Sequence, residues 1–346
     1  MKILLDDISI RNALYPFTAT RSVVDVRIGI LTIREKWELI YPDFIVLSEM
    51  QDDNVIKEAI KIPANIIPSK KLINRILDTG NITPPPDVIA IDHPWQIFEL
   101  NSDEIKSDFE LITKGKVSNS LSKSNNAISP ENIFIEEGAI IEHCILNASK
   151  GFIYVGKNVE VMEGSMLRGP IALCEGSVVK MGTKIYGATT IGPNCTVGGE
   201  IKNSILLGYS NKAHDGYLGD SVIGEWCNLG AGTSNSNLKN TAGAVSIWDK
   251  ASDKYILAGM KCGLLMGDYT RAAINTSFNT GTVTGVCCNI FGESVPPKYI
   301  PAFSLGNEKY KLEKALTDID KWKKLKGKSI TEKEIKILTD LFNSKN

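Results

Sequence analysis

The chain has 346 residues, enough for two or three domains with their own cores. Its apolar fraction of 43%, charged fraction of 23% and net charge of -1 are typical of a soluble globular protein, and they give no general attraction for nucleic acid or a membrane. No apolar run reaches the roughly 18 residues of a membrane span, and the N-terminus MKILLDDIS lacks the apolar core of a signal peptide, so we expect a cytoplasmic protein.

Residues 1–117 show the pattern of a small α/β domain. Buried parallel strands are expected at 3–5, 44–47 and 88–91. Helices are expected between them, at 28–39 and 69–77. Ser69 is a candidate N-cap for the second helix. Strands that alternate with helices indicate this fold class. A linker rich in Ser and Asn is expected at 118–132.

From residue 155 to about 202 an aliphatic residue returns at every sixth position. These residues are Val155, Val161, Leu167, Leu173, Val179, Ile185, Ile191 and Val197. The fourth residue after each is small or branched: Val159, Ser165, Ile171, Ser177, Thr183, Thr189, Cys195 and Ile201. This period is neither that of a strand nor that of an α-helix, and it predicts a triangular β-helix of hexapeptide repeats, with the aliphatic residues pointing inward. We expect this domain at 133–306.

The repeat is interrupted twice before it ends. It breaks at 203–216, and a longer insert runs from 234 to 254. Pro296-Pro297 ends the repeat, because proline cannot donate a hydrogen bond to a strand ladder.

The tail, 307–346, is rich in lysine and has helical periodicity. An apolar stripe predicts its first helix, and Thr331 followed by Glu334 predicts a capping box for its last. Acidic residues alternate with the lysines, so we expect a helical cap on the open end of the coil rather than a nucleic-acid site.

Seven cysteines are present, without a CxxC pair or a Cys/His spacing typical of metal sites. Those in the repeat segments are Cys174, Cys195, Cys227, Cys287 and Cys288. They are expected to be small buried side chains, and no metal site is predicted.

Function is expected where the period breaks, because loops held on a rigid frame present reactive groups. The first break contains His214, one of three histidines. A single loop histidine is more often a bystander than a base, but Arg168, Lys202, Tyr217 and Asn228 fall at coil positions around it. Arg and Lys bind an anionic phosphate, imidazole takes a proton from an amine that attacks an acyl carbonyl, and an asparagine amide stabilises the resulting oxyanion.

Four motifs, kept in one order, carry a family resemblance. They are Arg168-Gly-Pro, Val197-Gly-Gly-Glu200-Ile-Lys202, Lys212-Ala-His214-Asp-Gly-Tyr217-Leu-Gly-Asp and Asn228-Leu-Gly-Ala-Gly-Thr233. They resemble the acetyltransferase half of the bifunctional N-acetylglucosamine-1-phosphate uridylyltransferase/glucosamine-1-phosphate acetyltransferases, and equally the archaeal sugar-1-phosphate nucleotidylyltransferases. Over roughly residues 130–305, the resemblance implies a left-handed β-helix, homotrimers and a site between neighbouring coils.

By this resemblance His214 is the general base that deprotonates the amino sugar, and Glu200 supports the site. Arg168 and Lys202 grip the sugar phosphate. The full set implied is, for catalysis, His214, Asn228 and Glu200; for substrate binding, Arg168, Lys202, Tyr217, Asn237 and Lys239; and for contact with acetyl-CoA, Ala231 and Gly232. After Thr233 the chain departs from the family by a long insert.

The N-terminal half resembles a sugar nucleotidyltransferase domain of reduced size. The resemblance rests on Tyr15-Pro-Phe-Thr18, Thr20-Arg21 and Val26-Arg27-Ile-Gly-Ile-Leu-Thr-Ile-Arg34-Glu-Lys-Trp37. A full enzyme has a glycine-rich loop whose N–H groups bind triphosphate, whereas residues 6–11 contain no glycine. The residues that could still bind a nucleotide with Mg2+ are Asp7, Arg11, Arg21, Asp25 and Arg27. The alternative is a degenerate domain that docks on the coil.

Three functions therefore remain open. The favoured one is acetyl-CoA-dependent N-acetylation of an amino-sugar phosphate on the β-helix. The alternatives are sugar-1-phosphate nucleotidyl transfer from UTP or dTTP, with Mg2+, and a non-catalytic trimeric protein that binds sugar nucleotides. The expected partners are a sugar phosphate or sugar nucleotide and further copies of the chain, not nucleic acid or a membrane.

Overall fold

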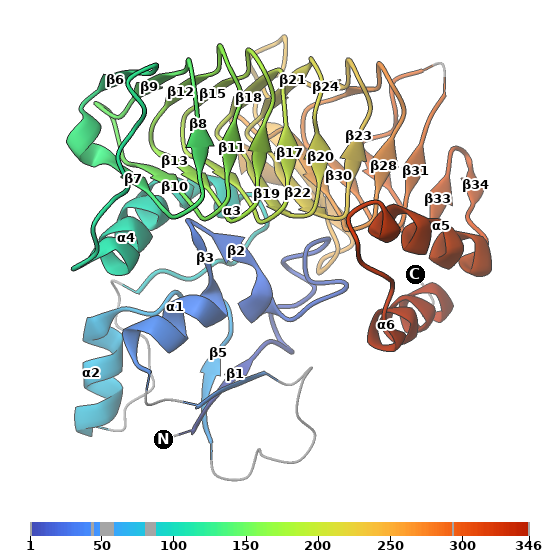
Figure 1. Ribbon diagram of the computed structural model, residues 1–346. Helices are drawn as coiled ribbons and strands as arrows, with labels where there is room; N and C mark the ends of the chain where they lie inside the picture. Colours follow the sequence, from blue (N-terminus) through green and yellow to red (C-terminus); the bar gives the residue numbers. More distant parts are fainter. Residues whose placement is uncertain (1, 43–44, 49–58, 80–87, 293, 345–346) are drawn as a thin grey trace.

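A long parallel β-helix lies across a smaller α/β domain, and two helices follow it (Figure 1). The computed structural model describes residues 2–42, 45–48, 59–79, 88–292 and 294–344. The expected class is confirmed: an α/β domain, then a left-handed β-helix, then a helical tail.

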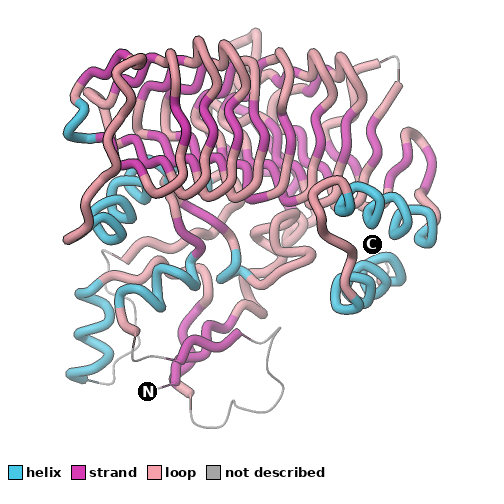
Figure 2. The backbone as a smooth tube through the Cα atoms, in the orientation of Figure 1, coloured by secondary structure: helices cyan, strands magenta, loops and turns pink. Residues whose placement is uncertain are grey.

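The β-helix has three faces, each a sheet that gains one short strand per coil (Figure 2). Face 1 has nine strands: β7 (Ile133–Ile135), β10 (Ile153–Val155), β13 (Ile171–Leu173), β16 (Thr189–Ile191), β19 (Ile205–Gly208), β22 (Val222–Glu225), β27 (Leu264–Met266), β30 (Thr282–Thr284) and β32 (Tyr299–Ile300). Face 2 has ten: β8 (Ile140–Ile141), β11 (Glu160–Val161), β14 (Val178–Val179), β17 (Thr196–Val197), β20 (Asn211–Lys212), β23 (Asn228–Leu229), β28 (Arg271–Ala272), β31 (Asn289–Ile290), β33 (Ser304–Leu305) and β34 (Glu308–Lys309). Face 3 has six: β6 (Asn126–Ile128), β9 (Ile145–Asn147), β12 (Met166–Arg168), β15 (Lys184–Tyr186), β18 (Glu200–Lys202) and β21 (Tyr217–Gly219). The pair β24 (Ser234–Asn235) and β29 (Ser277–Phe278) forms a separate two-stranded sheet.

The six-residue pattern determines which side chains enter the coil. The aliphatic residues from Val155 to Val197 are at most 1% exposed, and the residues four places after them are fully buried, so the repeat prediction is confirmed. Strand β6 lies inside the expected linker and pairs with β9, so the coil begins before residue 133. All seven cysteines are buried and free.

The N-terminal domain is built on a three-stranded parallel sheet in the order β4-β1-β5. These strands are β1 (Lys2–Asp6), β4 (Ile45–Ser48) and β5 (Ile60–Pro63). The expected strands at 3–5 and 44–47 are confirmed, except that residue 44 lies outside the described residues. The expected strand at 88–91 is wrong, because this segment hydrogen-bonds to the loop after β5 and forms only an isolated bridge there. Strand β5 was not expected.

The helices of this domain are α1 (Ile33–Ile40), α2 (Lys70–Thr79), α3 (Gln96–Glu99) and α4 (Asn101–Thr113). The helix expected at 28–39 begins later, because Gly29 at φ +74° turns a hairpin between β2 (Arg27–Ile28) and β3 (Leu31–Thr32). Thr32 then caps α1. The Ser69 cap of α2 is confirmed, since its hydroxyl accepts from the Leu72 N–H at 3.2 Å.

The N-terminal domain docks on face 1, so one apolar core spans both parts. Face 1 residues Ile205, Val222 and Val283 share a buried cluster with the core of the N-terminal domain. The Thr190 hydroxyl also donates to the Gly29 carbonyl at 2.8 Å. Face 1 is therefore closed to ligands where the domain covers it.

The 234–254 insert leads into an antiparallel hairpin of β25 (Val245–Asp249) and β26 (Lys254–Gly259). Val245 and Ile247 are fully buried in the cluster that joins the two domains. The hairpin thus strengthens the contact between the domains.

The tail forms α5 (Leu312–Lys324) and α6 (Glu332–Asn343), and the Thr331 capping box is confirmed. Both helices pack beside aromatic corner residues such as Trp226, Tyr269 and Phe303, which have left-handed φ values of 58°, 60° and 59°. The tail therefore covers the edge between faces 1 and 2 and not the open end of the coil, contrary to expectation (Figure 1).

Candidate functional site

The strands of face 3 lie along the upper edge of the β-helix in Figure 1, and this face carries two rows of outward side chains. Strand pairing aligns Arg168, Tyr186, Lys202 and Gly219 in one row and Met166, Lys184, Glu200 and Tyr217 in the other. Adjacent strands are about 4.8 Å apart, so the backbones of Arg168 and Lys202 lie about 10 Å apart on either side of Tyr186. The structure thus brings Arg168, Lys202, Glu200 and Tyr217 onto one surface.

Tyr186 links the two rows. Its hydroxyl donates to Glu200 Oε1 at 2.6 Å, and this hydrogen bond to a carboxylate raises the pKa of Tyr186 to about 12. Lys202 Nζ lies 5.8 Å from the centroid of the Tyr186 ring, within cation–π range. Sequence reasoning missed Tyr186, although it stands one coil of 18 residues after Arg168.

Tyr217 is held by a second network. Asn237 Nδ2 donates to the Tyr217 hydroxyl at 3.1 Å and to a carboxylate oxygen of Asp220, whose other oxygen accepts from Asn203 at 2.6 Å. Burial, followed by the charges of Asp220 and Glu200, raises the pKa of Tyr217 to about 12. Asp220, which ends the third motif but was given no role from the sequence, therefore orients Asn237.

His214 lies at the corner between faces 2 and 3, and its side chain is exposed. The neighbouring coils hold this corner from both sides. The Gly198 N–H donates to the Lys212 carbonyl at 2.7 Å, and the Gly232 N–H donates to the Asp215 carbonyl at 3.0 Å. The backbone of His214 is thus fixed while its imidazole faces solvent.

Gly216 carries the chain from this corner onto face 3. Its φ is +125°, and a Cβ there would lie 2.1 Å from the Thr233 carbonyl oxygen. Only glycine fits this turn, which places Tyr217 directly after the His214 corner. Ala231 and Gly232 lie at the same corner one coil later.

Lys212 is a buried amine beneath the His214 corner. It takes a position in the inward row of face 2, paired with Val197, where the repeat normally has an aliphatic residue. Its Nζ donates to the His214 carbonyl and, at 3.4 Å, to the Gly198 carbonyl. Burial lowers the pKa of Lys212 to about 8, against a weaker raising effect of Asp215.

Lys212→Met should stabilise the protein at pH 7 by up to roughly 3 kcal/mol, because unfolding of the wild type restores an ordinary lysine pKa near 10.5. Between about pH 8 and 10.5 the unfolded state binds more protons than the folded state. Wild-type stability should therefore rise across this window, and the gap to the variant should close. Urea unfolding at pH 7 and 10.5 measures both effects; a variant less stable at pH 7 would contradict them.

Asn228 lies away from the face 3 rows. It projects from face 2, where strand pairing places it between Asn211 and Arg271. It is thus one face removed from Lys202, on the other side of the His214 corner.

Lys239 lies in a polar cavity of about 600 Å3. Its lining residues are Ser236, Lys239, Asn240, Thr241, Ser277, Phe278, Asn279, Thr280, Val295 and Lys298. Burial and the nearby Lys239 charge lower the pKa of Lys298, so the two lysines make this cavity cationic.

The five residues expected to bind a nucleotide have structural partners. Arg21 pairs with Glu225 at 2.8 Å and with Asp268, both on the β-helix, and these carboxylates raise its pKa although burial opposes them. Asp7 accepts from the Val23 N–H at 3.2 Å, and Arg11 donates to the Thr18 carbonyl at 3.0 Å. Asp25 pairs with Arg34 at 2.8 Å, and Arg27 pairs with Glu35 at 3.4 Å. These contacts hold the domain together and dock it on the coil.

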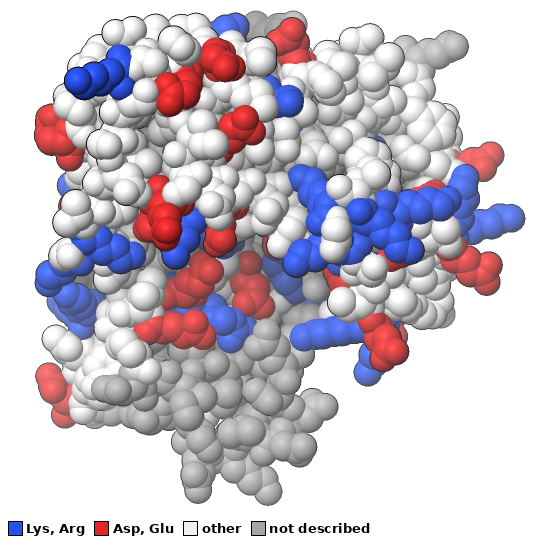
Figure 3. Space-filling view, in the orientation of Figure 1, with Lys and Arg blue, Asp and Glu red and all other residues white. Residues whose placement is uncertain are grey.

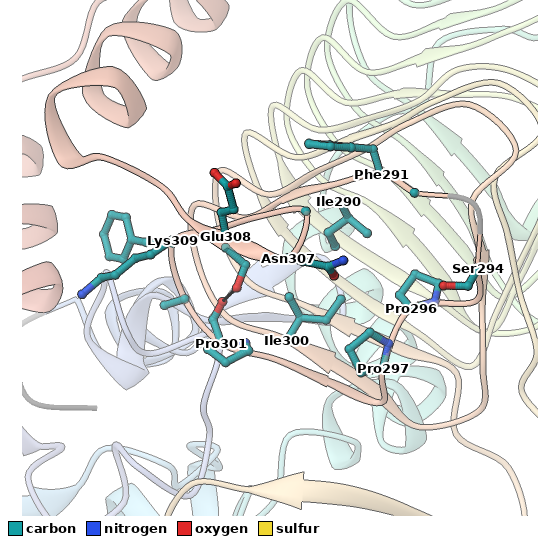
Figure 4. A pocket seen from close by; sticks show the side chains of 15 residues that line it. Ile290, Phe291, Ser294, Pro296, Pro297, Ile300, Pro301, Asn307, Glu308 and Lys309 are labelled. Atoms are coloured by element: carbon teal, nitrogen blue, oxygen red, sulfur yellow. Dashed lines mark hydrogen bonds between the residues drawn. The ribbon is translucent and has the colours of Figure 1, made fainter.

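A further cavity of about 530 Å3 lies at the end of the coil (Figure 4). Its walls include Ile290, Phe291, Pro296 and Pro297, with Glu308 and Lys309 at one side. None of the expected site residues lines it.

Comparison with known proteins fits this arrangement of domains. Residues 2–82 match the family described as sugar nucleotidyl transferase. The chain is 30% identical over 201 residues to the bifunctional protein GlmU of Methanocaldococcus jannaschii, covering 57% of this chain and 42% of that protein. It is 34% identical over 97 residues to the bifunctional sugar-1-phosphate nucleotidylyltransferase/acetyltransferase of Sulfurisphaera tokodaii, covering 28% and 24%.

The resemblance inferred from the motifs is confirmed by these matches. The chain spans about two fifths of the length of the GlmU proteins of Methanocaldococcus jannaschii and Methanococcus maripaludis. Within the described residues, no group of three or more His, Cys, Asp or Glu side chains is placed to hold a metal ion. No helix in the described ranges is long and apolar enough to cross a membrane.

Proposed function

We propose that the chain transfers the acetyl group of acetyl-CoA to the amine of an amino-sugar phosphate bound on face 3. The observation that carries the proposal is the arrangement on face 3. Arg168, Tyr186 and Lys202 form one row, and the neighbouring row ends at Tyr217, directly after the His214 corner. Two cations flanking a tyrosine suit a sugar phosphate, because Arg binds a phosphate by a planar fork and Lys as a point charge.

His214 is the general base in this proposal. Its exposed imidazole accepts a proton from the sugar amine as nitrogen bonds to the acyl carbon, and it returns the proton to the CoA thiolate that leaves when the C–S bond breaks. Glu200, held by Tyr186, and Tyr217, held by Asn237, would orient the sugar ring through hydroxyl hydrogen bonds. No step requires a metal ion.

The acyl donor would lie toward the later coils. The cavity that contains Lys239 and Lys298 has the charge to hold the phosphates of acetyl-CoA, which supplies the acetyl group as a thioester. The Ala231–Gly232 corner, stacked against the His214 corner, would line its path. The Asn228 amide would stabilise the oxyanion formed on the acyl carbonyl.

A homotrimer is part of the proposal. Face 3 exposes an apolar patch beside Arg168, with Ile128 at 51%, Ile145 at 45% and Met166 at 43% exposure. These residues line a hollow of about 430 Å3. Contiguous exposed apolar surface favours association, and a neighbouring coil on this hollow would enclose the phosphate site.

Replacing Lys202 with methionine tests the phosphate contact. The KM for glucosamine 1-phosphate should rise about 10-fold or more, because a charge-assisted hydrogen bond is lost, while kcat changes little. Release of free CoA thiol measures both constants. Lys184→Met, on the neighbouring row of the same face, is the matched control. An equal rise of KM in both variants would show that the rise comes from the loss of surface charge in general and not from a contact made by Lys202.

A second candidate function is sugar-1-phosphate nucleotidyl transfer. The match of residues 2–82 to the sugar nucleotidyl transferase family favours it. The structural partners of Asp7, Arg11, Arg21, Asp25 and Arg27 weigh against it. Pyrophosphate release from UTP or dTTP with a panel of sugar phosphates decides the question. Thermal stabilisation by sugar nucleotides without either activity would instead favour a binding protein.

A further inference from the structure

Arg271 is a buried cation without a carboxylate partner in the described part of the chain. It projects outward from β28 on face 2, yet it is only 8% exposed, because α5 covers it. Its Nε and Nη2 atoms are buried and make no hydrogen bond. A buried charge left unpaired costs several kcal/mol, roughly, so this guanidinium favours an anion.

The groups around Arg271 do not neutralise it. Its Cζ lies 5.2 Å from the centroid of the Trp322 ring, a cation–π contact that provides no hydrogen-bond acceptor for the buried Nε and Nη2 atoms. Tyr310 is nearby, but its hydroxyl donates to Asp318 at 2.6 Å, and Asp318 also pairs with Lys321. The Asp318 carboxylate is therefore already engaged.

Amides flank Arg271 on both sides. Strand pairing places Asn228 before it and Asn289 after it on the outer side of face 2. Asn228 is half-buried, and Asn211 extends the amide row by one further strand. An amide beside a planar fork offers the hydrogen-bond donors that a tetrahedral oxyanion requires.

Positive charge gathers at the same place. Figure 3 shows Lys and Arg side chains concentrated over α5. Just after the C-terminal end of α5, Lys326 reaches an earlier coil and donates to the Asn194 carbonyl at 2.6 Å. Such a patch raises the local concentration of anions.

We propose that Arg271 forms a phosphate-binding site between face 2 and α5. It lies one face away from the Arg168–Lys202 row and does not depend on acetyl transfer. The ligand class is a phosphate or phosphate ester, either free or as part of a sugar phosphate or nucleotide.

Calorimetric titration of inorganic phosphate into Lys202→Met protein tests this site. That background removes a contact proposed on face 3, and chloride keeps the ionic strength constant. One phosphate should bind per chain, and adding Arg271→Met should weaken binding about 10-fold or more. Arg271→Lys, which keeps the charge but loses the fork, should bind with intermediate strength. Undiminished binding to Arg271→Met, or no binding to the parent, would overturn the proposal.

Thermal unfolding in the absence of phosphate distinguishes a role of Arg271 in anion binding from a role in packing. Arg271→Met keeps the stem against Trp322 and removes an unpaired charge, so the Tm should not fall. A lower Tm with unchanged phosphate affinity assigns Arg271 to packing alone and also overturns the site. Titrations with glucosamine 1-phosphate and adenosine 3′,5′-bisphosphate then distinguish the sources, because the natural ligand class should bind more tightly than inorganic phosphate.

Discussion

His214→Ala should reduce the kcat for acetylation of glucosamine 1-phosphate by roughly 10²–10⁴-fold, the usual contribution of a general base. The KM should change little, because the phosphate is proposed to bind Arg168 and Lys202. The fold should be unaffected: the His214 side chain is exposed, and the corner is held through backbone groups. Steady-state kinetics by thiol release measures the loss, and the circular dichroism melt verifies the fold.

The chain provides a matched control for this substitution. His143 is also an exposed histidine at a corner between faces 2 and 3, with a left-handed φ of 54°, but four coils separate it from the His214 corner. His143→Ala should leave kcat unchanged. Wild-type rates in His214→Ala would remove the base assignment, whereas equal losses in both variants would point to a general effect on the coil.

The β-helix could be predicted in detail because its physics is local. A six-residue period makes every inward position from Val155 to Val197 aliphatic, and each coil contacts only its neighbours. The start of the coil was less visible, because β6 in the Ser- and Asn-rich segment buries little apolar surface. The sequence contains a signal that could have predicted where the tail docks. Corner positions held by Asn158 and Asn194 in early coils become Trp226 and Tyr269 in later ones.

The candidate site could be predicted only in part. The 18-residue coil aligns Arg168 with Tyr186, whereas Lys202 stands 16 residues after Tyr186, so only the start of the row follows from sequence arithmetic. The partners that hold the site do not, because Tyr186 with Glu200 and Asp220 with Asn237 depend on side-chain orientation. An arginine near a degenerate nucleotide motif gives no indication that its partners stand more than 200 residues away, as they do for Arg21.

Arg21 therefore best distinguishes the two roles considered for the N-terminal domain, nucleotide binding and docking on the β-helix. Arg21→Met should destabilise the protein by about 3–5 kcal/mol, because it leaves Asp268 as a buried carboxylate without its cation. The Asp268 side chain is 1% exposed, and it also accepts hydrogen bonds from Thr20 and from the Glu225 N–H. Urea unfolding at pH 7 measures the change.

Arg34→Met is the matched control, since the Arg34–Asp25 pair lies within the N-terminal domain and Asp25 is 32% exposed. Its cost should stay near or below about 1 kcal/mol, as for other partly exposed pairs. Asp268→Asn combined with Arg21→Met should recover part of the loss, because the uncompensated charge is then removed. If Arg21→Met leaves stability unchanged but abolishes binding of UTP or dTTP, Arg21 serves a nucleotide and not the joint between the domains. A large loss of stability instead makes the N-terminal domain a partner that braces the β-helix, because the same guanidinium cannot pair with Asp268 and grip a triphosphate.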